Sequence, residues 1–194
     1  MIGLVRQRDE AKERRILEGT LEVVQRQGLA GLSMEAVAKA AGVAIGTVYI
    51  YFESKEALLN ALYLDTKRAF ARTVLDGAEE REPVRPAFMR MCVAYLRWVA
   101  EHRAAMLFLH QFRNSPYLHE QTLEATSRSM EPLHALLERG KAEGLLKDLP
   151  TPLMVTFIAG TLAELAAYVQ TEPRKLHAER HALVARLAWD ALKA

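Results

Sequence analysis

The fold is decided by residues 33–59, which read SMEAVAKAAGVAIGTVYIYFESKEALL. Ser33 has a side-chain oxygen suited to cap a helix start, and apolar residues recur after it at helical spacing. Gly42 can take the positive-φ position of a tight turn, and a second short helix is then expected from Ile45 to about Tyr51. The spacing therefore predicts two short helices joined by a tight turn, which is a helix-turn-helix.

The second of these helices has an unusual composition for a helix on a protein surface. It carries no charged residue, so apolar and hydroxyl side chains would be exposed together. Threonine and tyrosine hydroxyls donate to phosphates, and apolar groups contact the methyl group of thymine. Gly46 weakens the helix by roughly 1 kcal/mol relative to alanine but allows close approach of the backbone to a phosphate. Lys55 adds a positive charge at the start of the next helix, so this region predicts binding to double-stranded DNA.

Residues 33–59 resemble the DNA-binding signature of the TetR family of bacterial transcription regulators, and the resemblance extends over roughly residues 16–64. It implies an all-α protein that binds operator DNA through the second helix of the motif. The phosphate contacts that it implies are Ser33, Tyr51 and Lys55, and the groove contacts are Ile45, Thr47 and Tyr49. The family often has serine or threonine where Ala44 stands, so we expect this helix to lack a side-chain cap worth ~1 kcal/mol.

The rest of the chain is also predicted to be helical, because helical spacing recurs and sustained alternation with period 2 does not. We expect about nine helices, and Pro132 should kink or split the one predicted over residues 118–143. A charged stretch with two prolines at residues 79–86 is the best candidate for a boundary. The predicted organisation is a helix-turn-helix DNA-binding domain at 1–54, a connecting helix at 55–78 and a ligand-binding and dimerisation domain at 79–194.

Aromatic and methionine side chains crowd the middle helices, a composition shared by ordinary cores and by sites for hydrophobic ligands. Glu164 stands alone on an apolar helix, where a buried carboxylate would need a partner. We expect a small apolar or acyl-type effector rather than a sugar or a metal complex. The predicted ligand-binding residues are Phe88, Met91, Tyr95, Trp98, Phe108, His110, Phe112, Tyr117, Met130 and Glu164.

The last two predicted helices suit subunit packing, because the first of them is apolar nearly all round and needs cover on several faces. Two such helices from each subunit would form a four-helix interface, as the resemblance also implies; packing within one subunit is the alternative. The predicted interface residues are Phe157, Gly160, Leu165, Tyr168, Leu183, Val184 and Leu187. A homodimer would place two recognition helices in successive major grooves, ~34–36 Å apart.

Bulk composition excludes several other classes of protein. The 194 residues are 51% hydrophobic and 26% charged, with a net charge of +2, so the chain is globular and any DNA-binding surface must come from the placement of charge. The start resembles no secretory signal, and the longest apolar stretch is interrupted by Glu164, so we expect a cytoplasmic protein outside the membrane. Cys92 is the single cysteine, which excludes an internal disulfide, and we expect no metal and no cofactor.

These observations predict a sequence-specific transcription regulator. The favoured form is a repressor that a small molecule releases from its operator. Two alternatives stay open. A ligand-independent architectural DNA-binding dimer would have a filled C-terminal core and many genomic sites. An all-α enzyme is disfavoured for two reasons. No carboxylate completes a metal-binding motif with any of the six histidines, and the sequence has no nucleophile elbow or phosphate-binding loop.

Overall fold

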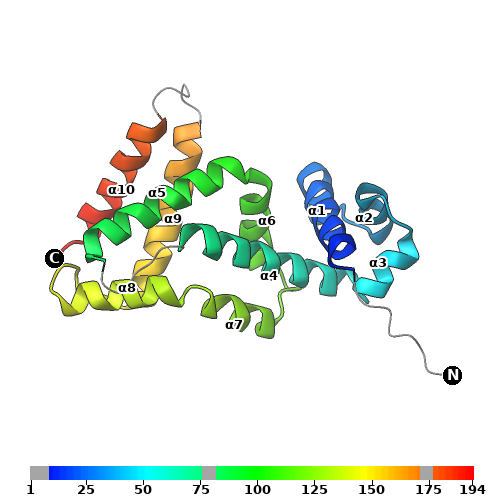
Figure 1. Ribbon diagram of the computed structural model, residues 1–194, viewed down its shortest axis with the longest axis horizontal. Helices are drawn as coiled ribbons and strands as arrows, with labels where there is room; N and C mark the ends of the chain where they lie inside the picture. Colours follow the sequence, from blue (N-terminus) through cyan, green and yellow to red (C-terminus); the bar gives the residue numbers. More distant parts are fainter. Residues whose placement is uncertain (1–8, 76–81, 171–176) are drawn as a thin grey trace. The chain divides into compact units, whose positions relative to one another are not determined.

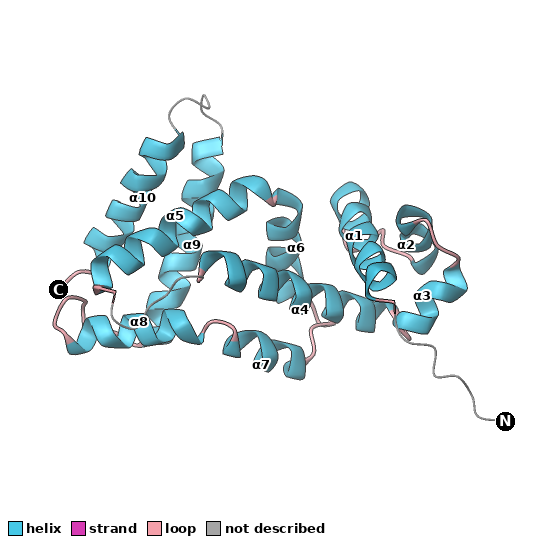
Figure 2. Cartoon of the chain, viewed as in Figure 1, coloured by secondary structure: helices cyan, strands magenta, loops and turns pink. Residues whose placement is uncertain are grey.

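Ten α-helices make up the regular secondary structure of the residues that the computed structural model describes, which are 9–75, 82–170 and 177–194 (Figure 1 and Figure 2). The helices are α1 (Glu10–Gln27), α2 (Met34–Ala41), α3 (Ile45–Tyr51), α4 (Lys55–Val74), α5 (Val84–Glu101), α6 (Arg103–Arg113), α7 (Glu120–Arg128), α8 (Glu131–Ala142), α9 (Thr151–Gln170) and α10 (His177–Leu192). The β-type pairing among these residues is one isolated bridge between Leu146 and Lys193. The predicted all-α fold is confirmed.

The tenth helix arises where one helix was expected over residues 118–143. The chain forms α7 and α8 there instead, and α7 ends at Arg128. In a continuous helix the ring of Pro132 would clash with the carbonyl of Arg128, four residues earlier. In the observed fold Pro132 lies in the first turn of α8, where the missing N–H leaves no helical hydrogen bond unmade.

The chain divides into two compact units. Unit 1 comprises residues 1–67 and 104–125, and unit 2 comprises residues 68–103 and 126–194. Unit 1 thus contains α1, α2, α3 and the first part of α4, together with α6 from its second residue and most of α7. Unit 2 contains the remainder of α4 and α7, with α5, α8, α9 and α10.

In unit 1, α1 packs against α2 and α2 packs against α3. Gly19 of α1 makes the first contact possible, because a Cβ atom at this position would lie 2.8 Å from the backbone nitrogen of Ala41. Ile16, Val37 and Val48 are fully buried in the resulting core. Sequence reasoning did not single out Gly19, since its partner lies 22 residues further along the chain (41 − 19).

A buried amide anchors the segment between α6 and α7 to α4 within unit 1. The side-chain nitrogen of Asn60 donates to the carbonyl oxygens of Glu56 at 2.9 Å and Tyr117 at 2.7 Å. Its side-chain oxygen accepts from the backbone N–H of His119 at 2.9 Å. Asn60 is 6% exposed, so these bonds satisfy an amide that water could not reach.

In unit 2, α5 packs against α8, α9 and α10, and α9 and α10 run side by side in opposite directions (Figure 1). Phe88 of α5 meets Trp189 of α10 edge-on, with ring centroids 5.5 Å apart. Thr151 ties α8 to the start of α9: its hydroxyl donates to the Glu138 carboxylate and accepts from the Lys141 ammonium at 2.9 Å.

Candidate functional site

The helix-turn-helix forms from α2, the turn at residues 42–44, and α3. The hydroxyl oxygen of Ser33 accepts a hydrogen bond from the Ala36 N–H at 3.1 Å and so caps α2. Gly42 adopts a left-handed conformation with φ +64°, which favours glycine because it has no Cβ atom. Ala44 stands at the N-cap of α3 and makes no side-chain cap, as the sequence predicted. These features fix the direction in which α3 leaves the turn.

The outward face of α3 is apolar and uncharged. Ile45 is 40% exposed, Tyr49 is 49% exposed and Ile50 is 61% exposed, while Val48 is fully buried. Thr47 is half-buried. Ile50 is the most exposed of these residues and was not among the predicted DNA contacts, although the inward position of Val48 in a 3.6-residue repeat could have placed it there.

Gly46 has no intramolecular reason to be glycine. It is exposed, its φ is not positive, and a Cβ atom added to it would meet no atom within 4 Å. Gly19, by contrast, is required by the neighbouring helix. The backbone at Gly46 is therefore open to approach from outside the protein.

The three predicted phosphate contacts all have partners within unit 1. The Tyr51 hydroxyl accepts from the Asp9 N–H at 3.0 Å and donates to the Asp9 carbonyl oxygen at 3.4 Å. Tyr51 is only 9% exposed, so its hydroxyl links α3 to the start of α1. The Lys55 ammonium donates to the Leu29 carbonyl oxygen at 3.3 Å, which uses one of its three protons, and the Ser33 hydroxyl proton is not used by the cap. Phosphate binding by these residues stays a prediction.

The ten predicted ligand-binding residues are divided between the two units and differ widely in exposure. In unit 2, Phe88, Met91, Tyr95 and Trp98 are buried on α5, Met130 is half-buried and Glu164 is exposed. In unit 1, Phe108 and Phe112 are fully buried, whereas His110 and Tyr117 are exposed.

Ring contacts account for much of this aromatic set. Phe70 meets Tyr95 and Trp98 edge-on at 5.6 and 5.1 Å in unit 2. Phe108 and Phe112 stack at 5.5 Å in unit 1. Burial raises the pKa of Tyr95 to about 12, and its hydroxyl lies 3.5 Å from the Ala159 carbonyl oxygen, to which it donates. These aromatic residues pack as core, and their role in ligand binding stays a prediction.

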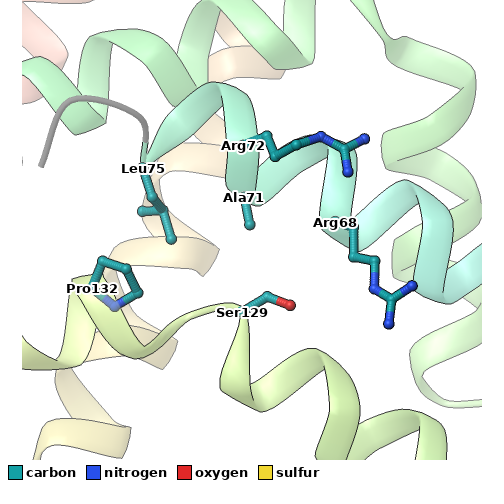
Figure 3. A pocket seen from close by; sticks show the side chains of 6 residues that line it. All are labelled: Arg68, Ala71, Arg72, Leu75, Ser129 and Pro132. Atoms are coloured by element: carbon teal, nitrogen blue, oxygen red, sulfur yellow. The ribbon is translucent and has the colours of Figure 1, made fainter.

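A surface cavity of about 480 Å³, largely open to solvent, lies in unit 2 between α4 and the junction of α7 with α8 (Figure 3). It is lined by Arg68, Ala71, Arg72, Leu75, Ser129 and Pro132. None of these residues was predicted. The available signal was the spacing of three α4 residues and of Leu75 directly after the helix, which recur at i, i+3, i+4 and i+7 and therefore share one face.

The predicted dimer residues lie on α9 and α10 of unit 2, and most of their apolar side chains are exposed. The exposed fractions are 41% for Phe157, 59% for Tyr168, 49% for Leu183 and 52% for Leu187. Of the remaining three, Gly160 is exposed, Leu165 is half-buried and Val184 is buried. Exposed large apolar residues gathered on two neighbouring helices are typical of an interaction surface.

The apolar composition of α9 also bears on whether this helix could cross a membrane. By length and hydropathy its window Thr151–Tyr168 would suffice to cross a membrane, and 22% of that window is buried. One such helix is weak evidence for a membrane span.

Among the described residues, metal binding and side-chain reactivity depend on the titratable groups. In the described part of the chain no group of three or more His, Cys, Asp or Glu residues could hold a metal ion. Cys92 is buried, and this burial raises the pKa of its thiol to about 12. A thiol with that pKa is unreactive near neutral pH.

Both parts of the chain match a described protein family. Residues 16–62 match "Bacterial regulatory proteins, tetR family", and residues 63–194 match "Tetracyclin repressor-like, C-terminal domain". Together these matches run from the middle of α1 to the end of the chain.

Individual relatives agree with the family matches. The fatty acid metabolism regulator protein of Bacillus subtilis is 26% identical over 156 residues, which is 79% of this chain and 80% of that protein. The crystal structure of a TetR family transcription regulator from Marinobacter aquaeolei VT8 is 29% identical, with a TM-score of 0.86 over 97% of this chain and 99% of the other. The transcriptional regulator FadR from Bacillus subtilis in complex with stearoyl-CoA is 19% identical, with a TM-score of 0.68 over 89% and 97% of the two chains, a likeness of fold alone.

Proposed function

Because the chain belongs to the TetR family of bacterial transcription regulators, we propose that it acts as a repressor that an acyl-type or other apolar small molecule releases from operator DNA. Membership of this family makes the chain a DNA-binding regulator and not an enzyme. The observation that carries the proposal is the exposed, uncharged face of α3, on which Ile45, Tyr49 and Ile50 are each at least 40% exposed.

This face supports recognition in the major groove. Apolar side chains that would be poorly placed in water can contact thymine methyl groups, and the open backbone at Gly46 allows a phosphate to come close. We propose that Ile45, Thr47 and Tyr49 face the bases. The DNA phosphates would be bound by Ser33, Gly46, Tyr51 and Lys55. The hydrogen bonds between Tyr51 and Asp9 would hold the Tyr51 ring in place for this contact.

We also propose a homodimer formed through α9 and α10. The exposed residues Phe157, Tyr168, Leu183 and Leu187 supply the apolar area that such an interface needs, and the exposed Gly160 would let two helices approach closely. A two-fold dimer presents two copies of α3 to two half-sites ~34–36 Å apart. In this scheme residues 1–54 bind DNA, residues 55–78 connect, and residues 79–194 bind ligand and dimerise.

Two of the comparisons support an acyl-type effector. Both point to a Bacillus subtilis regulator: the matched protein is named for fatty acid metabolism, and the matched FadR structure holds stearoyl-CoA. Release from DNA requires that the ligand bind more tightly to the state in which the recognition helices no longer fit successive grooves. Aromatic packing among the predicted ligand residues favours the second candidate, a dimer that binds DNA without an effector.

The test is a titration of the purified chain onto a labelled fragment of its own upstream intergenic DNA, beside a scrambled fragment, at two salt concentrations. We expect specific binding to exceed non-specific binding by ~10³ or more and to weaken as salt rises. Adding acyl compounds to the specific complex then separates the two candidates, because only the ligand-released repressor leaves the DNA. Failure to bind any DNA, including fragments recovered by genomic selection, would refute the proposal.

A further inference from the structure

We propose that the cavity between α4 and the α7–α8 junction binds an amphipathic anion, whose charged end pairs with Arg68 and Arg72 and whose apolar end lies against Leu75 and Pro132. The inference rests on the proposed function, since it assigns a place and a charge to the effector. It differs from the sequence prediction in both respects, because that prediction placed an apolar ligand among other residues.

The two arginines are the first reason. Arg68 and Arg72 are one helical turn apart, both are exposed to solvent, and both line the cavity. Like charges at this spacing repel each other, and no described residue forms an ion pair with either guanidinium. Two neighbouring guanidinium groups are well suited to bind a carboxylate or a phosphate through paired hydrogen bonds. An anion between them would remove the repulsion.

The distribution of side chains around the cavity is the second reason. Leu75 and Pro132 lie at one end and Arg68 at the other, and Ser129 lies between them with its hydroxyl directed towards the Arg68 end (Figure 3). Ala71 lies between the ends and leaves room, because its side chain is a single methyl group. A ligand with one charged end and one apolar end matches this asymmetry, whereas a neutral apolar molecule would offer the two exposed arginines no charged partner.

The size of the cavity is the third reason. A volume of about 480 Å³ falls within the ~300–1,000 Å³ of small-molecule sites. That space suits a medium-length acyl chain with its acidic end group. The shared chemistry is therefore an anionic group on an alkyl chain, and either a carboxylate or a phosphate could supply it.

Calorimetric titration of the full chain with three probes of equal chain length tests the proposal: decanoate, decyl phosphate and decanol. We expect at least one of the anions to bind about tenfold more tightly than decanol, or better, because decanol lacks the charge-assisted hydrogen bonds. The stronger of the two anions identifies the preferred end group. The variant R68Q/R72Q should lose about tenfold or more in affinity for the anions and keep its affinity for decanol.

Two further variants make the result specific to this cavity. Arg97→Gln removes an exposed arginine of unit 2 that does not line the cavity, and it should leave all three affinities unchanged. Ala71→Phe fills the cavity and should weaken all three probes. Equal binding of decanol and the anions, no binding of either anion, or unchanged anion binding by R68Q/R72Q would overturn the assignment. Operator binding by the unmodified chain is measured separately, so failure of this assignment can be told from failure of the proposed function.

Discussion

Exchange of Gly46 for alanine should strengthen the folded chain and weaken its complex with DNA. The two effects have different origins. In the free protein an added Cβ atom at this position meets no atom within 4 Å, and the backbone φ is not positive. In the complex the same methyl group would stand where we propose that a phosphate approaches the backbone of α3.

The gain in stability follows from helix propensity. Glycine is ~0.8–1.0 kcal/mol less favourable than alanine in a helix interior. Gly46 is the second residue of a seven-residue helix, so we expect about half of that, or ~0.5 kcal/mol. For a chain of this length, such a change raises the melting temperature by roughly 1–2 °C.

The loss in DNA affinity follows from the phosphate contact. A hydrogen bond to a charged group contributes ~1.5–3 kcal/mol, so displacing it weakens binding by about tenfold to about hundredfold for each half-site. We would measure the free energy of unfolding by urea denaturation and operator affinity by titration of the labelled fragment.

Ala44→Ser is the matched control in the same helix. It supplies the missing N-cap of α3, which should stabilise the chain by ~1 kcal/mol. It should leave operator affinity intact, because it adds no atom at Gly46. If Gly46→Ala binds the operator as tightly as the unmodified chain, no phosphate approaches that backbone. If Ala44→Ser also weakens binding, stiffening of α3 is the cause and the steric argument is wrong.

Three further predictions concern the packing of α1 against α2, the proposed dimer and the accessibility of Cys92. Gly19→Ala should lower the free energy of unfolding by about 1–3 kcal/mol, because the new Cβ atom would lie 2.8 Å from the backbone nitrogen of Ala41; an unchanged urea midpoint would contradict this. Leu187→Glu should convert the proposed dimer to monomers in sedimentation velocity, because a charge would replace a leucine that is 52% exposed in the single chain; a dimer of unchanged affinity would remove this residue from the interface. Native Cys92 should resist iodoacetamide at pH 8 and react once urea unfolds the chain, because burial raises its pKa from 9.0 to about 12; native labelling at the unfolded rate would show that the thiol is accessible. Since the folded pKa lies above the ordinary one, the stability that this thiol contributes is complete below pH 9 and is lost as the pH rises towards 12.

Local signals explain what could be predicted of the DNA-binding region. Ser33 caps its helix through the N–H three residues later, and Gly42 turns the chain through its own φ angle, so both effects act within a few residues. The break at Pro132 is equally local, because the clash that it avoids involves the carbonyl four residues before it. Nothing remote in the chain is needed to anticipate these features.

The sequence by itself determined the helical class, the helix-turn-helix and the family, because caps, turns and apolar periodicity depend on neighbouring residues. Only the tertiary structure decided which side chains meet across long separations. The requirement for Gly19, the hydroxyl contact of Tyr51 with Asp9, and the hydrogen bonds of Asn60 with Tyr117 and His119 all join residues at least 22 positions apart (41 − 19 for the closest pair, Gly19 with Ala41). The cavity that contains Arg68 belongs to the same class, since α4 and the α7–α8 junction form its wall together. Periodicity can place a residue on a face of its helix, but which element covers that face is set by packing.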